Sequence, residues 1–347
     1  MRESAHQMPD LPGGPISRRR ALKITAVAGI STAFLGSVTA GLLRIAGLQR
    51  FESTRSQMGT RVTIAALHPD AEEARALVDA AFEEMERLEN ILSRHRSGTA
   101  LDQLNRQGSL QEAPPELLHI LERARAFSEL SDGAFDATIA PLLRLYEHAE
   151  VLPRPSEVAR ALSLVDYREV HVRGRDIFFG KPGMAVTLDG MAKGFIVDMA
   201  TEGLRSGGID RVMVEAGGDV ASTRGSAVTE GWRVAVQDPR DSQGILGIVR
   251  LDGQAVATSG DYAQTFSDDP TLHHILDPRT GRSPQLTSSV TVIAPTAMEA
   301  DALSTTAFVM GAVKGLRLLE QLEGIEGLIV NKLSEAETTS GFARYSA

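Results

Sequence analysis

Apolar and polar residues alternate over residues 61–67 ("RVTIAAL"), which indicates a half-buried β-strand. A helical spacing follows directly, because apolar residues then recur three and four positions apart through residues 71–92. The apolar positions of this segment are Ala74, Leu77, Val78, Ala81, Met85, Leu88 and Leu92. Asp70 and Glu73 stand at its start with the spacing of a capping box. The pattern predicts a long amphipathic helix packed on a sheet.

Further helices and strands follow along the chain. A second helix is predicted after Pro114 and Pro115, ending at the S-D-G turn of residues 131–133. Seven short segments are predicted to be strands: 169–172, 176–179, 184–188, 211–215, 232–236, 246–251 and 288–294. Helical patterns at 191–206, 298–310 and 313–322 interrupt them.

The strands come in groups joined by turn signals, and the helices do not alternate regularly with them. This arrangement predicts an α+β fold with a largely antiparallel sheet and flanking helices, rather than a doubly wound sheet. Pro153 and Pro155 mark the best position for a seam between two lobes.

Composition narrows the chemistry that this body can perform. The 347 residues are 42% apolar and 23% charged, as in a globular protein, and contain no cysteine. Disulfides, thiolate metal sites and cysteine nucleophiles are therefore excluded, so any metal must take oxygen or nitrogen ligands. The first fifty residues carry a net charge of +5 and the remaining 297 a net charge of −14. An acidic body argues against nucleic-acid binding.

The N-terminal segment has the pattern of an export signal. Three consecutive arginines, Arg18 to Arg20, precede an uncharged run at residues 24–43 that is about as long as a bilayer-spanning helix. Small residues ending at Ala40 offer a cleavage site, and the paired arginines resemble a twin-arginine signal. We therefore assign residues 1–50 to a signal or a retained membrane anchor. Residues 51–347 form the functional domain, in the periplasm or on the outer face of the inner membrane.

The common nucleotide and metalloprotease motifs are absent from the sequence: G-x-G-x-x-G after a strand, G-x-x-x-x-G-K-[ST] and H-E-x-x-H. What remains is a set of glycine-bearing turns, each of which taken alone is more often an ordinary turn. The segment "LDGMAKGF" (188–195) is the most suggestive of these turns as an anion-binding site, because a predicted strand leads into it and a helix follows it. A turn of this kind points free N–H groups at an anion, and Lys193 lies at the junction.

The segment "PTAMEADALSTT" (295–306) contains two acids at the start of a predicted helix. Thr296 and Glu299 have the spacing of a capping box, so Glu299 needs no function. Asp301 lies beyond the first turn, and the hydroxyl of Thr305 shares its face at i+4. A carboxylate plus a hydroxyl suits Mg²⁺, which keeps water ligands and takes others from substrate phosphates. A surface aspartate, with Thr305 bonded back to a carbonyl, is the alternative.

Two adjacent histidines, His273 and His274, precede a D-P-x-T-G turn. In an extended segment neighbouring residues point to opposite faces, so only one of the two is expected to face a site. That residue is a candidate base.

Taken in order, eight motifs resemble those of the ApbE-type FAD:protein FMN transferases: "MGT", "LSRHRSGTALDQLN", "DGAFDAT", "LDGMAKGFIVD", "EAGGDV", "TSGDY", "HHILDPRTG" and "SVTVIAPTAMEADALSTT". The resemblance implies a two-lobed, T-fold-like α+β body with FAD in the cleft between the lobes. It also implies a magnesium-dependent reaction. The FMN half of FAD is attached to a threonine or serine hydroxyl of an exported or membrane-bound electron-transfer flavoprotein, and AMP is released.

The resemblance also implies roles for particular residues. Asp301, Thr305 and the backbone carbonyl of Gly190 correspond to the magnesium ligands. The FAD contacts correspond to Met58, His95, Ala134, Phe135, Asp136, Thr187, Lys193 and His274. Either His274 or Asp136 is the candidate acceptor of the hydroxyl proton.

The sequence departs from the family pattern at three of its positions. The family usually has aspartate at the place of Thr187 and glycine at the place of Asp189, and frequently tyrosine at the place of His95. Two alternatives therefore stay open beside the transferase: an FAD pyrophosphatase that releases FMN and AMP, and a non-catalytic flavin-binding assembly factor for a respiratory complex. The chain has no D-G-x-[ST]-G-A-[ST] acceptor segment, so modification of itself is disfavoured.

Overall fold

One antiparallel sheet of eight strands organises the part of the chain that the computed structural model describes, which is residues 47–147, 152–224, 231–266 and 271–347. In spatial order the strands are β1 (Gln49–Gln57), β2 (Thr60–His68), β6 (Arg211–Ala216), β7 (Asp219–Ser222), β10 (Ala255–Gly260), β11 (Thr287–Ala294), β12 (Glu326–Asn331) and β13 (Ala336–Thr338). Every neighbouring pair runs antiparallel.

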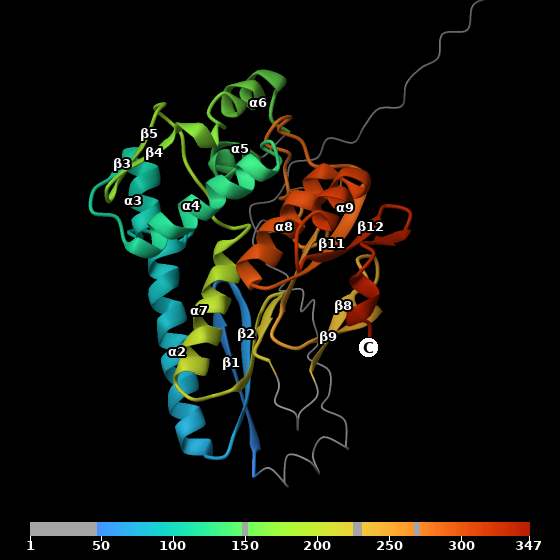
Figure 1. The fold of residues 1–347 in the computed structure, drawn as a ribbon. Helices are drawn as coiled ribbons and strands as arrows, with labels where there is room; N and C mark the ends of the chain where they lie inside the picture. The colour runs from blue at the N-terminus through green and yellow to red at the C-terminus, as the bar shows by residue number, and fades with distance from the viewer. Residues whose placement is uncertain (1–46, 148–151, 225–230, 267–270) are drawn as a thin grey trace, which may run out of the picture.

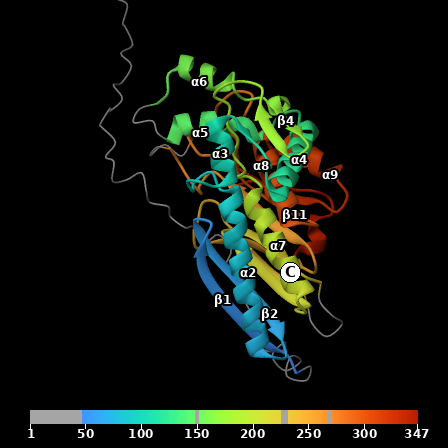
Figure 2. The same ribbon diagram turned by 90° about the vertical axis from the view of Figure 1, so that its left-hand side faces the viewer.

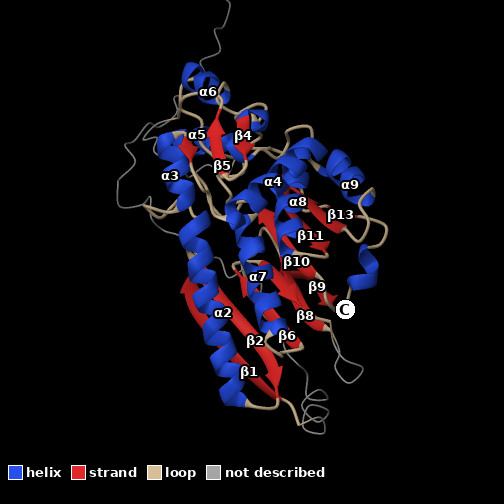
Figure 3. Ribbon diagram, turned by 60° about the vertical axis from the view of Figure 1, so that its left-hand side comes forward, coloured by secondary structure: helices blue, strands red, loops and turns tan. Residues whose placement is uncertain are grey.

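Helices cover one face of this sheet, as Figures 2 and 3 show. They are α2 (Ala71–Leu92), α7 (Ala192–Ser206), α8 (Ala297–Met310) and α9 (Ala312–Glu320). A two-stranded ribbon of β8 (Trp232–Gln237) and β9 (Ile245–Leu251) packs on the other face together with the turn η3 (Phe342–Tyr345). Because both faces are covered, β6 and β11 are buried at every position, although β6 contains Arg211 and Glu215 and half of β11 is threonine and serine.

A second, smaller lobe lies beyond the C-terminal end of α2 (Figure 1). Its α-helices are α3 (Ala100–Gln107), α4 (Pro115–Leu130), α5 (Ala140–Glu147) and α6 (Pro155–Leu162), with the short 3₁₀ helices η1 (Ala137–Ile139) and η2 (Tyr167–Glu169). A three-stranded sheet completes it, formed by β3 (Ser109–Leu110), β4 (Val170–Arg173) and β5 (Asp176–Phe179). The α+β fold with a largely antiparallel sheet is therefore confirmed. The seam predicted at Pro153 and Pro155 is wrong, because α5 and α6, which flank these prolines, both belong to the smaller lobe.

The predicted export segment lies outside the described residues. Within the part of the chain that is described, the helices are all too short or too polar to cross a membrane.

Local sequence explains where α2 begins. Asp70 is the N-cap of α2, and its Oδ1 accepts hydrogen bonds from the N–H groups of Glu72 and Glu73, 2.8 and 3.1 Å away.

The strand predicted at residues 184–188 is wrong. No strand in the described part of the chain pairs with this segment; the side chain of Asn105 instead bonds both the N–H and the C=O of Val186, at 2.7 and 2.8 Å.

The helices α7 and α8 cross at very short range. A Cβ atom on Gly194 would lie 2.3 Å from the carbonyl oxygen of Ala297, so only glycine fits there. Asp198 of α7 accepts hydrogen bonds from the N–H groups of Ala297 and Met298, at 2.7 and 2.9 Å. In return, the N–H of Gly194 donates to Oδ2 of Asp301 in α8, at 3.3 Å. Each helix thus supplies a carboxylate to the N-terminal turn of the other.

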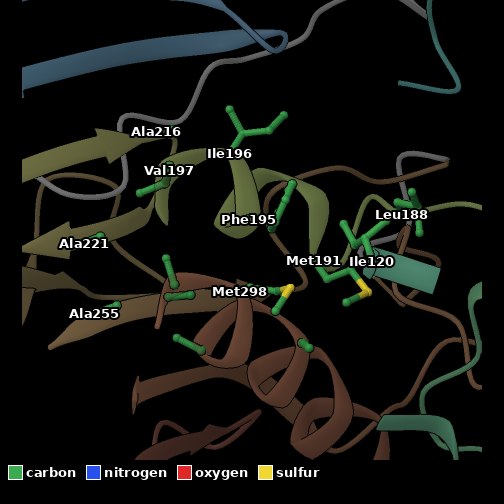
Figure 4. Close-up of a cluster of buried hydrophobic side chains, with 14 of the residues drawn as sticks. Ile120, Leu188, Met191, Phe195, Ile196, Val197, Ala216, Ala221, Ala255 and Met298 are labelled. Atoms are coloured by element: carbon green, nitrogen blue, oxygen red, sulfur yellow. The ribbon is translucent and has the colours of Figure 1, made fainter. Parts of the chain in front are cut away.

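Apolar side chains fill the space around this crossing (Figure 4). Met191 and Phe195 at the start of α7 lie near Met298 of α8, and Leu188 and Ile120 close the cluster on the side of the smaller lobe. The hydrogen bonds that Asp198 and Asp301 accept from the opposite helix therefore form in surroundings from which water is largely excluded.

We expect Gly194→Ala to lower the free energy of unfolding by about 2–3 kcal/mol, because the added methyl group meets backbone that cannot rotate away. Gly203→Ala in the same helix is the matched control. No atom lies within 4 Å of a Cβ at this exposed position, so alanine should stabilise the protein by about 0.5–1 kcal/mol. Chemical denaturation measures both. Equal and small effects of the two substitutions would contradict the close crossing.

Candidate functional site

Three residues predicted as a metal site come together between α8 and the turn that precedes α7. Asp301 is 6% exposed, and Thr305 follows it by one turn on the same helix. A Cβ atom on Gly190 would lie 3.4 Å from Thr305 Oγ1 and 3.4 Å from the ring of Phe135. Gly190 therefore brings its backbone against the Thr305 hydroxyl, which also lies 3.0 Å from Ser259 Oγ of β10.

A second buried acid, Asp219, adjoins Asp301. Asp219 starts β7 and is 2% exposed, and its Oδ2 accepts a hydrogen bond from Lys193 Nζ. Burial and the neighbouring Asp219 carboxyl hold the pKa of Asp301 well above its usual range. Burial lowers the pKa of Lys193, but Asp219 and Asp301 outweigh that effect and raise it above the ordinary value. One ammonium thus balances two carboxyl groups, which leaves room for further positive charge.

The donor set fits a small, hard divalent cation. A carboxylate, a hydroxyl and a backbone carbonyl are oxygen ligands of the kind that Mg²⁺ binds when water and substrate phosphates complete its shell. Among the described residues, no three His, Asp or Glu side chains are placed to hold a metal by themselves. The arrangement therefore suits a metal that shares its ligands with a substrate.

Glu299 is separate from this set. Thr296 is the N-cap of α8, and its Oγ1 accepts a hydrogen bond from the N–H of Glu299, at 3.2 Å. In a capping box the Glu299 side chain would accept the N–H of Thr296. Here Glu299 Oε1 accepts a hydrogen bond from Arg123 Nη2 instead, at 3.2 Å. Asp198 covers the first N–H groups of the helix instead. Its pKa is raised to about 6, chiefly by burial.

The two adjacent histidines point to opposite sides, as expected for an extended segment. His273 is fully buried, edge-on to the ring of Phe308, with Nε2 3.1 Å from the carbonyl oxygen of Pro284. His274 is partly exposed, and its Nδ1 lies 3.1 Å from the carbonyl oxygen of Gln264. A carbonyl can only accept, so Nδ1 carries the proton and Nε2 keeps a free lone pair. Burial lowers the pKa of His274, which favours this neutral form.

The segment Ala134, Phe135 and Asp136 forms a buried wall between α4 and η1. Both oxygens of Asp136 accept structural hydrogen bonds: Oδ1 from the Thr138 N–H and hydroxyl at 2.8 and 2.6 Å, and Oδ2 from the Tyr167 N–H at 3.0 Å. Burial raises the pKa of this carboxyl. The contacts indicate that Asp136 holds the segment 134–136 against Thr138 and Tyr167. Its role as a proton acceptor stays a prediction.

The remaining predicted flavin contacts lie on turns. Met58 occupies the hairpin turn between β1 and β2 with a φ of 51°, and its N–H donates to Glu89 Oε2 at 3.1 Å. Thr187 is buried, and its Oγ1 accepts a hydrogen bond from the N–H of Asp189 at 3.1 Å. His95 is largely exposed and lies with Nε2 3.3 Å from Asp189 Oδ2.

Asp219 was not predicted as a member of the site, although it lies in the glycine-bearing segment "EAGGDV". Gly217 and Gly218 both have positive φ, 55° and 104°, so the chain turns sharply before β7 and presents Asp219 at its first position. An aspartate that opens an apolar strand after two glycines was the available signal. Its pairing with Lys193 is a contact that local pattern does not reveal.

Comparisons with known proteins identify the family of this chain. The model of the ApbE family matches residues 58–329. A curated FAD:protein FMN transferase of Treponema pallidum is 31% identical over 293 residues, which are 78% of this chain and 81% of that protein. One of Vibrio cholerae is 28% identical over 323 residues, covering 89% and 95%.

Solved structures give the same result. The ApbE protein of Thermotoga maritima has a TM-score of 0.78 and 32% identity, and the match covers 86% of this chain and all of that one. The flavin transferase ApbE of Vibrio cholerae has a TM-score of 0.75 and 27% identity, covering 86% and 99%.

Proposed function

The chain belongs to the ApbE family, and on that premise we propose that it is a magnesium-dependent transferase that moves the FMN half of FAD to a hydroxyl group of another protein. The cluster of Asp301, Thr305, Gly190 and Lys193 is the observation that carries the proposal. It gathers oxygen ligands for a divalent cation and a fixed positive charge at one place, as the pyrophosphate of FAD requires. The acceptor is a threonine or serine of an electron-transfer flavoprotein outside the cytoplasm, in keeping with the predicted export segment.

The residues of the cluster have different roles in binding the metal and the pyrophosphate. Asp301, Thr305 and the Gly190 carbonyl would hold Mg²⁺, which when bound neutralises charge on the pyrophosphate. Lys193, held by Asp219, adds a positive charge whose position is fixed before the substrate arrives. Its side chain is 27% exposed, so the ammonium group remains accessible from the site.

His274 is the proton acceptor that the contacts favour. Its Nδ1 is engaged with Gln264, so Nε2 is available to the acceptor hydroxyl. As that oxygen forms a bond to the FMN-side phosphorus, the bond from this phosphorus to the bridging oxygen breaks and AMP departs with the electron pair. The hydroxyl proton passes to His274 Nε2. Asp136 is less suited to this step because both of its oxygens already accept hydrogen bonds.

The proposal is tested by incubating the protein with FAD, Mg²⁺ and a purified candidate acceptor, first of all an exported electron-transfer protein encoded near this chain. The acceptor should gain the mass of FMN less one water, with one AMP released for each transfer. Free FMN with no gain in acceptor mass would favour the pyrophosphatase for that acceptor. Binding of FAD without any AMP release would favour the non-catalytic assembly factor.

In the same assay Asp301→Ala should reduce AMP release at least about 100-fold, because a buried site loses its charged metal ligand. Glu299→Ala is the matched control two residues away. It removes an ion pair with Arg123 and should leave activity within about threefold. Equal losses in the two variants would contradict the assignment of Asp301 to the metal site.

The pH dependence of transfer tests His274. Only the neutral imidazole accepts a proton, and the folded protein lowers its pKa below the ordinary 6.5. The acid limb of kcat/KM, which reports the free enzyme, should therefore lie below pH 6.5, and His274→Ala should lose about 10²–10⁴-fold in kcat/KM together with that limb. An acid limb that persists unchanged in the variant would assign the proton to another group.

A further inference from the structure

A buried arginine joins three separate elements beside the proposed site. Arg94 follows the end of α2, and its side chain is 8% exposed. Its Nη1 and Nη2 donate to the two carboxylate oxygens of Glu147 in α5, at 3.1 and 2.6 Å, and its Nε donates to Asp189 Oδ2 at 2.7 Å. Because the guanidinium group is planar and held on two sides, it fixes Asp189 in one position.

Asp189 in turn holds His95. A carboxylate only accepts hydrogen bonds, so the His95 Nε2 that lies 3.3 Å from Asp189 Oδ2 must carry a proton, and Asp189 raises the pKa of this imidazole. The side chain of His95 is nevertheless 62% exposed. A buried anchor therefore ends in an oriented ring that faces away from the core.

Arg94, Glu147, Asp189 and His95, together with Thr187, form one network of hydrogen bonds. This network contains all three positions at which the sequence departs from the family pattern. Thr187 accepts the backbone N–H of Asp189, and Asp189 accepts from His95, so residues 95, 187 and 189 are connected although they come from two distant segments. Hydrogen bonds therefore link all three positions to one another in this chain.

The position of the network places it at one end of the site. Asp189 precedes Gly190, whose backbone lies against Thr305, and the charges of Asp189 and Glu147 both act on His274. Lys193 instead pairs with Asp219. Asp189, Arg94, Glu147 and His95 therefore adjoin the proposed metal-binding turn at Gly190, on the side whose charges reach the proposed proton acceptor, near which the FMN half of the substrate must react.

We propose that Asp189 is a positioning residue that holds the ring of His95 as a contact for the isoalloxazine end of FAD. This inference rests on the proposed function. A planar heteroaromatic ring with carbonyl and imide groups can stack on the imidazole or bond its outer Nδ1. Holding the ring beforehand reduces the entropy lost on binding. An exposed histidine–carboxylate pair by itself adds little to stability, so its effect should appear in flavin binding.

The test compares two ligands in the presence of Mg²⁺: FAD, and ADP-ribose, which keeps the adenosine diphosphate and lacks the flavin. Dissociation constants are measured by calorimetry over a period in which no AMP is released. Asp189→Ala should weaken FAD about tenfold, the scale of one charged hydrogen bond, and change ADP-ribose less than about twofold. Asp189→Asn should recover part of the loss, because it keeps the shape and one acceptor.

A second comparison tests whether Asp189 acts through His95. His95→Ala should weaken FAD by a factor similar to that of Asp189→Ala, and the double variant should be no worse than either single one. Glu202→Ala, which removes an exposed ion pair with Arg205 on α7, is the control and should leave both dissociation constants unchanged. Thermal unfolding verifies that each variant folds; if Asp189→Ala does not, Asp189→Asn replaces it.

Equal weakening of FAD and ADP-ribose would overturn the inference, since Asp189 would then act through the Gly190 turn. No weakening of either ligand would overturn it as well, as would independent, multiplicative effects of Asp189→Ala and His95→Ala. Failure of the wild-type protein to bind FAD with Mg²⁺ would overturn the proposed function together with the inference. The failure of one is thus distinguishable from the failure of the other.

Discussion

The crossing of α7 and α8 at Gly194 is the contact on which the site depends. A Cβ atom there would lie 2.3 Å from the Ala297 carbonyl oxygen, so the two backbones touch directly. This proximity lets Asp198 of α7 accept the first N–H groups of α8, while Asp301 of α8 accepts the Gly194 N–H of α7. The N–H groups left unpaired at two helix starts are thereby satisfied by carboxylates from the opposite helix.

The same exchange gives Asp301 its chemistry. A carboxyl group that is 6% exposed and adjoins another buried acid is costly to ionise unless positive charge is near. Lys193 supplies part of that charge and is already engaged by Asp219. A divalent cation and the pyrophosphate it accompanies would complete the balance, so the crossing of the two helices also provides the proposed binding site.

Local pattern predicted the residues whose geometry is local. The i, i+4 spacing placed Asp301 and Thr305 on one face of α8, and extended backbone separated His273 from His274. Local pattern could not predict contacts between distant segments. These contacts are Asn105 with Val186, Asp198 with the start of α8, Asp219 with Lys193, and Arg94 with Asp189. Each of these depends on a polar side chain whose partner only the fold brings near.

A crystal structure of the protein with FAD and Mn²⁺ in place of Mg²⁺ tests the central claim most directly, because the anomalous signal of Mn²⁺ locates the metal without reference to the protein. Our account predicts a metal peak within about 2.0–2.3 Å of an Asp301 carboxylate oxygen, Thr305 Oγ1 and the Gly190 carbonyl oxygen, with the FAD pyrophosphate completing its shell. A metal bound elsewhere, with FAD in place and the Asp301 carboxylate still accepting the Gly194 N–H as in the structure described above, would contradict it.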